Sequence, residues 1–200
     1  MTSQQLFEGK EVLPINGRSG KLFFLSPFHM FEFTGKDGQQ FSCLEQHMEY
    51  SKAKFFEDDE TAMKILQATT IKDFQRLGAK VKGFNAEKWT KQKYAIMQSG
   101  ILHKFCTSLT LAKKLARTAG YTLAWCEFCD KFWSCGCKDI DPVIYHPSVW
   151  KGQNRYGWAL MFVRDVLFNT IGPEYSETYR EGVLNARFYP QSFVISRIEG

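Results

Sequence analysis

Three side chains able to do acid–base or nucleophilic chemistry share one face of a predicted helix. In CLEQHMEYSKAKFF (43–56), Leu44, Met48, Ser51 and Phe55 recur at helical spacing. Glu45 and Lys52 then lie two turns apart on nearly the same azimuth, with Glu49 between them. The row presents acid, acid and amine together. A surface ion pair worth roughly 0.2–0.5 kcal/mol would have the same spacing, so the spacing alone leaves both interpretations open.

A second candidate for chemistry is WCEFCDKFWSCGC (125–137), which combines a C-x-x-C and a C-x-C motif. Zinc knuckles are usually well separated in sequence, whereas only five residues part these two pairs; His146 is a candidate extra ligand. A thioredoxin-like redox pair needs its C-x-x-C at a helix start in a βαβ setting, which the downstream pattern does not provide. We therefore predict free thiols and no metal site.

The elements around these segments indicate an α+β fold in which helix dominates. Apolar residues 22–33 and 39–43 flank Asp37-Gly38, a turn signal that predicts a β-hairpin. Helices are expected over 44–55, after Asp58 or Asp59, after Asn85, after Thr110 and over 156–168, and a strand over 121–126. The expected architecture is a single compact domain with several helices around a small sheet.

Composition narrows the class of protein. The 44% hydrophobic and 24% charged fractions are ordinary for a globular chain, and the 16% aromatic fraction favours a stacked core or a site for flat rings. Net charge is +5, and seven basic residues against two acidic ones lie in 72–93, a balance that suits phosphates. A solvated helix face would have the same charge balance.

No signal peptide or membrane span is evident, which predicts a cytoplasmic protein, or a nuclear one in a eukaryote.

Several segments, in order, resemble the NADAR family, named for NAD and ADP-ribose. The blocks that carry the resemblance are FLSPF (24–28), LEQHMEYSKAKFF (44–56), RLGAKVKGF (76–84), Trp89 with KYAIM (93–97), HKF (103–105), Asp130 with Trp133, and WKGQNRYGWALMFVR (150–164). The resemblance covers roughly residues 20–170. It implies a NADAR-like domain there, an N-terminal extension over 1–19, and a C-terminal extension over 171–200 packed on the domain.

The resemblance also implies an activity, the hydrolysis of N-glycosidic bonds at ribose. Family members cleave ribosylamino-pyrimidine phosphates of riboflavin synthesis or remove ADP-ribose from guanine in nucleic acid. We expect the second activity here, with the metabolite hydrolase and a catalytically weakened ADP-ribose-binding module as alternatives. The expected partners are an ADP-ribose or ribose-phosphate adduct and the DNA or RNA that carries it. No cofactor and no membrane partner are expected.

The requirements for breaking the C1′–N bond suggest roles for the catalytic candidates Glu45, Lys52 and Asp130. Breaking C1′–N builds positive charge at C1′, which a carboxylate stabilises, and Glu45 and Asp130 are the candidates. A ring-opened ribose has an aldehyde-level C1′ that an amine can attack, and Lys52 is the amine in this segment. We therefore expect Lys52 to act as nucleophile or acid and Glu45 to move protons.

A further group of residues is expected to bind substrate because of the family motifs in which they lie. Asn154 precedes an apolar helix, where it could bind ribose or phosphate or simply cap the helix. Trp133 could stack on a base or fill the core. Arg164, within the apolar helix, is expected to be a buried structural partner. The complete substrate-binding set is Ser26, Phe28, Met48, Arg76, Trp89, Glu127, Trp133 and Asn154.

Three positions depart from the family pattern. Family members usually have Asn at Pro27, Arg at Ala79 and Glu at Trp125. Arg76 could take the place of the Arg missing at Ala79. Glu127, on the same side of a strand as Trp125, could take the place of the Glu missing there. Two outcomes follow, either an altered substrate specificity or a loss of catalysis with binding retained. A zinc-dependent nucleic-acid-binding domain is the competing class.

Overall fold

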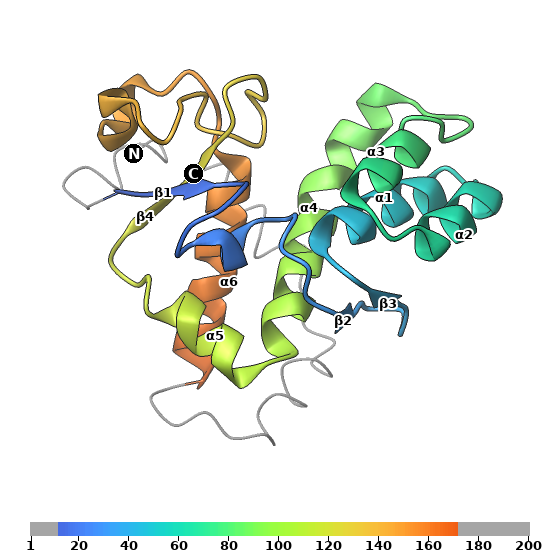
Figure 1. The fold of residues 1–200 in the computed structure, drawn as a ribbon, viewed down its shortest axis with the longest axis horizontal. Coiled ribbons are helices and arrows are strands. Elements are labelled where there is room, and N and C mark those ends of the chain that lie inside the picture. Colours follow the sequence, from blue (N-terminus) through green and yellow to red (C-terminus); the bar gives the residue numbers. More distant parts are fainter. Residues whose placement is uncertain (1–11, 172–200) are drawn as a thin grey trace. The chain divides into compact units, whose positions relative to one another are not determined.

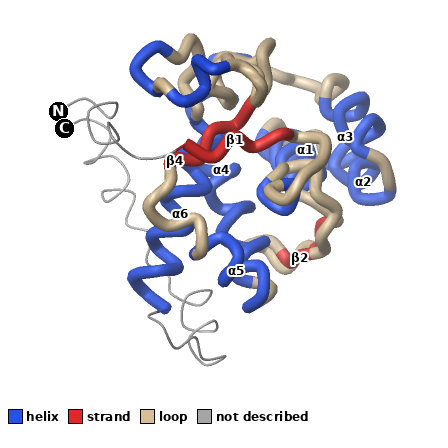
Figure 2. Tube along the Cα trace, turned by 60° about the vertical axis from the view of Figure 1, so that its left-hand side comes forward, coloured by secondary structure: helices blue, strands red, loops and turns tan. Residues whose placement is uncertain are grey.

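The structure is a computed structural model that describes residues 12–171. Its contacts divide the described residues into a central unit, residues 16–111, and a terminal unit, residues 12–15 with 112–171. Helices predominate and the strands are short (Figure 1), and the same balance is visible in the Cα trace (Figure 2). The predicted α+β, mostly helical class is confirmed.

The central unit is built mainly from helices. In chain order its elements are η2 (Phe23–Leu25), β2 (Phe33–Thr34), β3 (Gln40–Phe41), α1 (Leu44–Phe55), α2 (Asp59–Gln67), α3 (Ile71–Gly78) and α4 (Ala86–Cys106). Helix α1 contacts α2, α3 and α4, so it is the element around which the unit packs. Its buried Ala53 joins an apolar cluster with Ile65 and Phe74.

Side-chain caps place these helices where the sequence predicts them. Asp58 precedes α2 and accepts a hydrogen bond from the Thr61 amide at 3.1 Å, while its second oxygen accepts one from the Lys82 amide at 2.8 Å. These bonds hold the pKa of Asp58 down at about 2. Asn85 caps α4 by accepting from the Lys88 amide at 2.9 Å. Asp58 therefore also fixes the chain that leads from α3 to α4.

The predicted hairpin exists but is shorter than expected. Strands β2 and β3 are antiparallel, with Phe33 opposite Phe41, and Gly38 takes the left-handed φ of 77° in the turn. Residues 22–32 are not a strand, because Phe23–Leu25 forms a 3-10 turn and Pro27 follows it. Within this run Leu25 is fully buried without strand pairing, whereas Met30 is 52% exposed.

Lys104 is fully buried in α4 and holds the 24–26 segment. Its Nζ donates to the carbonyl oxygens of Phe24 at 3.3 Å and Ser26 at 3.2 Å. Burial lowers the pKa of Lys104 to about 7, against a small opposing effect of Cys43. This lysine anchors the segment FLSPF to the longest helix of the central unit.

The pKa of Lys104 predicts how stability varies with pH. Between pH of about 7 and 10.5 the unfolded chain binds a proton that the folded chain lacks, so the free energy of unfolding should rise with pH by about 1 kcal/mol per unit. Lys104→Met should lack this rise, whereas Lys113→Met, at an exposed position, should retain it. Urea denaturation at pH 7 and pH 9 measures the difference. Equal pH dependence in wild type and Lys104→Met would refute the assignment.

The terminal unit combines a two-stranded sheet with one long helix. Strand β1 (Val12–Asn16) lies beside β4 (Thr122–Cys126), so residues before position 20 take part in this sheet. After β4 come η3 (Pro142–Tyr145), η4 (Pro147–Val149) and α6 (Arg155–Ile171), which packs on β4. Helix α5 (Leu109–Ala116) spans the boundary between the units. The predicted packing of 171–200 lies outside the described residues, apart from Ile171, where α6 ends.

Arg164 is the buried structural partner that the sequence predicts. Its Nη1 donates to the carbonyl oxygens of Thr118 at 2.7 Å and Tyr121 at 2.9 Å, and it is 4% exposed. The guanidinium therefore satisfies the carbonyls of the turn between α5 and β4. Among residues 12–171 no helix is long and apolar enough to cross a membrane.

Candidate active site

The acid–acid–amine row of α1 exists, and it faces α3. Lys52 Nζ forms an ion pair with Glu49, and the two side chains are only 12% and 17% exposed. One turn earlier, Glu45 accepts a hydrogen bond from Gln75 of α3 at 2.8 Å. The three side chains are therefore held in a sheltered position rather than spread over a solvated helix face. This geometry favours the chemical interpretation over the surface ion pair.

A glycine of α3 makes room for Glu49. A Cβ added at Gly78 would lie 1.6 Å from Oε2 of Glu49 and 2.4 Å from its Cδ, which no real packing allows. Any other residue at this position would therefore displace the carboxylate that contacts Lys52. Helix propensity disfavours glycine inside a helix by about 1 kcal/mol, so close packing is the reason for Gly78 here.

Burial favours the protonated forms of both carboxylates, Glu45 and Glu49. The pKa of Glu45 is raised to about 7, chiefly by burial and further by Glu49, against the opposing effects of Gln75 and Lys52. The pKa of Glu49 is also raised by burial, against the opposing effect of Lys52. A carboxyl group with a pKa near neutrality can both give and take a proton at physiological pH.

Trp89, Arg76 and Met48 are further residues of the central unit that were predicted to bind substrate, and their surroundings differ. Trp89 is half-buried, and its ring centroid is 6.2 Å from that of Phe55, the last residue of α1. Arg76 is exposed on α3 and pairs with Asp73 at 2.9 Å, so its charge is partly engaged. Met48 is 7% exposed and belongs to the core, where packing is sufficient to explain it.

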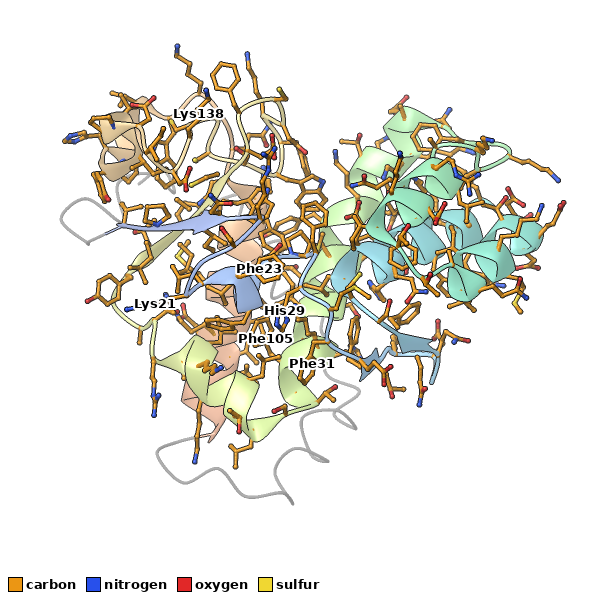
Figure 3. All side chains as sticks on the ribbon, in the orientation of Figure 1. Lys21, Phe23, His29, Phe31, Phe105 and Lys138 are labelled. Atoms are coloured by element: carbon orange, nitrogen blue, oxygen red, sulfur yellow. The ribbon has the colours of Figure 1, made fainter. Side chains whose placement is uncertain are left out.

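Ser26 and Phe28 lie in the segment that Lys104 anchors. Ser26 is fully buried; its hydroxyl donates to the Gly17 carbonyl at 3.3 Å and accepts from the Phe28 amide at 3.1 Å. The hydroxyl is thus engaged with backbone and shapes the turn that presents Phe28. Next to this turn, the rings of Phe23 and His29 meet at 5.5 Å (Figure 3).

The terminal unit holds the other predicted site residues. Asp130 accepts hydrogen bonds from the amides of Phe132 at 2.8 Å and Trp133 at 2.9 Å through one carboxylate oxygen, which forms a tight turn. Trp133 is half-buried and packs edge-on against Phe132 at 4.8 Å. Glu127 has an exposed side chain, and its backbone is held by the Ser134 hydroxyl. Asp130 therefore has a structural role in this turn, and the catalytic role predicted for it would be an additional one.

Asn154 clamps the strand that precedes this turn. Its Oδ1 accepts from the Trp125 amide at 2.9 Å and its Nδ2 donates to the Leu123 carbonyl at 2.8 Å. The residue is 1% exposed and has a left-handed φ of 49°. Trp125 itself is buried and contacts Tyr156 edge-on at 5.1 Å, so the position that family members usually fill with Glu is here part of the core.

A family model described as the NADAR domain matches residues 16–168. The chain belongs to the NADAR family. The sequence-based assignment is therefore confirmed.

Two curated relatives and one solved structure resemble this NADAR chain. N-glycosidase R617 of Acanthamoeba polyphaga mimivirus is 30% identical over 131 residues, which cover 66% of this chain and 77% of the relative. Protein irg-1 of Caenorhabditis elegans is 29% identical over 131 residues, covering 64% of this chain and 62% of that protein, which is less than two thirds of its length. The NMR structure of the E. coli protein YbiA superposes with a TM-score of 0.65 at 21% identity, covering 83% of this chain and 91% of YbiA, which supports the fold.

Within this NADAR domain, Asn154 gives a stability prediction. Asn154→Ala would leave a buried amide and a buried carbonyl of β4 without their partners, so we expect the free energy of unfolding to fall by about 2–5 kcal/mol. Gln153→Ala, at the exposed neighbouring position, should change it by less than about 0.5 kcal/mol. Thermal unfolding followed by circular dichroism compares the two variants. A loss of similar size in both would contradict the role assigned to Asn154.

The cysteines of the NADAR domain are free thiols, as the sequence predicts. Cys135 and Cys137 are buried in an apolar cluster against which Cys126 packs, and Cys129 is exposed. The interaction of the Cys126 thiol with Cys135, together with burial, raises the pKa of Cys126. No cluster of three or more His, Cys, Asp or Glu side chains suited to a metal ion occurs within residues 12–171.

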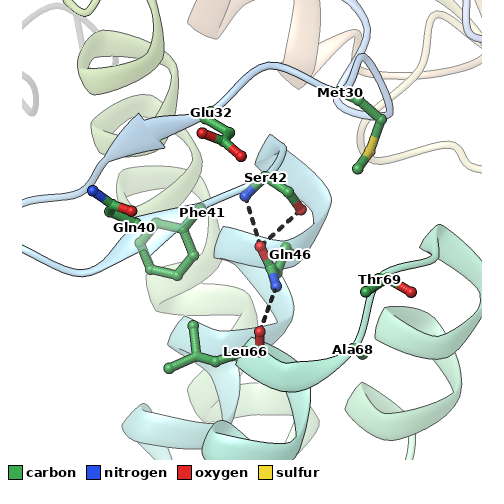
Figure 4. Close-up of a pocket in the computed structure, with 9 residues that line it drawn as sticks. All are labelled: Met30, Glu32, Gln40, Phe41, Ser42, Gln46, Leu66, Ala68 and Thr69. Carbon is green, nitrogen blue, oxygen red and sulfur yellow. Dashed lines mark hydrogen bonds between the residues drawn. The ribbon is translucent and has the colours of Figure 1, made fainter.

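A separate hollow of about 280 Å³ lies between the β2–β3 hairpin and helices α1 and α2 (Figure 4). The Gln46 amide spans it, accepting from the Ser42 amide at 2.7 Å and donating to the Ile65 carbonyl at 3.0 Å. None of the predicted site residues is among those that line it. The hollow is therefore a structural feature of the hairpin and not the candidate active site.

Two contributors to the site escaped the sequence analysis. Gln75 binds Glu45, and Gly78 makes room for Glu49, yet both lie on α3, a helix that the sequence analysis did not predict. The signal that could have found them is the helical spacing from Ile71 to Gly78 after the capping Thr70.

Proposed function

We propose that this protein is an N-glycosidase that hydrolyses the bond between ribose C1′ and a base nitrogen. The observation that carries the proposal is the sheltered row of Glu45, Glu49 and Lys52, with the pKa of Glu45 raised to about 7. An isolated surface ion pair would need neither the burial nor the glycine opposite Glu49. The similarity to a protein named as an N-glycosidase supports this general activity.

The three side chains suffice for a balanced reaction. Glu49 takes a proton from Lys52, and the neutral amine attacks C1′ as the C1′–N bond breaks. Glu45 in its protonated form donates to the departing base nitrogen. The ribosyl-lysine opens to a Schiff base, and water then releases the ribose with a free anomeric hydroxyl and regenerates Lys52. The catalytic role predicted for Asp130, in the terminal unit, is a separate hypothesis that this reaction does not require.

The substrate that we propose is ADP-ribose attached to guanine in nucleic acid. A net charge of +5 and the exposed Lys72, Lys80 and Lys88 suit a polyphosphate or a nucleic-acid strand. Trp89 and Arg76 are the further residues of the central unit that we assign to substrate binding. In the terminal unit, substrate binding by Trp133 and Glu127 stays a prediction, whereas both amide atoms of Asn154 are bound to β4.

One assay tests the proposal and separates it from the alternatives. Purified protein is incubated with an oligonucleotide carrying ADP-ribosylated guanine and, in parallel, with a ribosylamino-pyrimidine phosphate, and products are identified by liquid chromatography and mass spectrometry. We expect free ADP-ribose from the oligonucleotide. Turnover of the metabolite alone would identify the small-molecule hydrolase. ADP-ribose binding without turnover of either compound would identify a weakened binding module and overturn the enzymatic proposal.

A further inference from the structure

An exposed aromatic ring stands beside the candidate nucleophile. The centroid of the Phe84 ring is 5.9 Å from Lys52 Nζ, and Phe84 is 49% exposed. Phe84 therefore offers apolar ring surface to solvent next to Lys52.

The backbone and one neighbouring ring hold Phe84 in place. It lies between Gly83, which adopts the left-handed φ of 68°, and Asn85, the N-cap of α4. On one side its ring packs edge-on against Phe56 at 5.4 Å, while half of its surface remains free. A rigid ring with a free surface is the type of side chain on which bases stack.

The ring belongs to a short aromatic row at the end of α1. Phe56 packs edge-on against Phe55 at 4.9 Å, and Phe55 is 6.2 Å from Trp89. Phe55 is itself 39% exposed. The ring pairs of this row are inclined by 48–84°, so the rings form a clustered apolar surface beside Phe84, which suits a flat heteroaromatic group and not a second sugar or phosphate.

We propose that Phe84 stacks on the base attached to the ribose that Lys52 attacks. The inference rests on the proposed function, because it uses Lys52 as the attacking amine. An attacking atom must lie about 3–3.5 Å from C1′, and the base is bonded directly to C1′. Stacked rings have centroids about 4.5–7 Å apart. A ring centred 5.9 Å from Nζ is therefore within reach of the base and too far to obstruct the attack.

The test measures binding of the base separately from turnover. Guanosine 5′-monophosphate and ribose 5-phosphate are titrated by calorimetry into wild type, Phe84→Ala, Phe84→Trp and Phe128→Ala. The last is the matched control, an exposed phenylalanine of the terminal unit whose ring lies 6.0 Å from the Nζ of Lys138. Phe84→Ala should weaken guanosine 5′-monophosphate binding about 5- to 100-fold and leave ribose 5-phosphate unchanged. Phe84→Trp should restore binding.

Hydrolysis of the ADP-ribosylated oligonucleotide by the same variants distinguishes the two proposals. If wild type binds guanosine 5′-monophosphate through Phe84 but hydrolyses nothing, the proposed function fails, and Phe84 is a base-binding residue without a role in hydrolysis. If wild type turns over the oligonucleotide while Phe84→Ala keeps wild-type nucleotide binding and KM, the stacking role fails alone. Absence of guanosine 5′-monophosphate binding by wild type would also overturn the stacking role of Phe84.

Discussion

Lys52→Ala should reduce release of ADP-ribose by about 10³-fold or more, because no other amine of the α1 row could attack C1′. The loss should appear in kcat, with KM for the adduct nearly unchanged, since Lys52 is expected to act in the chemical step. Steady-state kinetics on the ADP-ribosylated oligonucleotide provide both values.

The matched control is Lys54→Ala on the same helix. Lys54 is also a lysine paired with a carboxylate, Asp59, but its side chain is 49% exposed and faces solvent. The Lys54→Ala variant should retain wild-type kinetics. Lys52→Arg keeps the charge beside Glu49 but loses the nucleophilic amine, so it should be as inactive as Lys52→Ala while keeping the wild-type melting temperature. An active Lys52→Arg enzyme would mean that Lys52 is not the nucleophile.

Glu45→Gln is expected to have the second largest effect, a fall in kcat of about 10²–10⁴-fold. The protonated carboxyl is the form that donates to the leaving base, so wild-type kcat should fall as pH rises above the Glu45 pKa of about 7. The glutamine variant should lack this limb, because its amide does not titrate. A wild-type profile without a limb near pH 7 would contradict the role of Glu45 as proton donor.

The same substitution should stabilise the protein at alkaline pH. The pKa of Glu45 is higher in the folded chain, about 7, than its ordinary value of 4.5, so the folded state binds more protons between these values. Stability due to Glu45 is therefore lost as pH rises from about 4.5 through 7. Glu45→Gln should melt at a higher temperature than wild type at pH 8 and near the wild-type temperature at pH 4. Glu60→Gln, at an exposed carboxylate paired with two lysines, should not show this gain.

The parts of the fold that the sequence predicts well are those with local signals. Asp58 and Asn85 act as caps because their side chains bond amides only three residues ahead. The Asp37-Gly38 turn likewise depends on local backbone preference. The run 22–32 failed as a strand because the 3-10 turn at Phe23–Leu25 and the long-range bonds from Lys104 to the carbonyl oxygens of Phe24 and Ser26 fix its backbone, and no local pattern encodes those bonds.

The candidate site shows the same division. Helical spacing correctly places Glu45, Glu49 and Lys52 together, since all three lie on one helix. Their partners Gln75 and Gly78 come from another helix, and only tertiary packing reveals them. The pKa of Glu45 was equally inaccessible, because burial is its largest cause. Phe84 was hidden for the same reason, as its significance is its distance from Lys52.

The most direct test of the central claim is to trap the covalent intermediate. The protein is mixed with the ADP-ribosylated oligonucleotide in the presence of sodium borohydride, and the intact mass and the modified peptide are determined. The proposed mechanism predicts a stable ADP-ribosyl adduct on Lys52 in wild type and in Lys54→Ala, and none in Lys52→Ala. Turnover with no adduct, or an adduct on a different lysine, would contradict it.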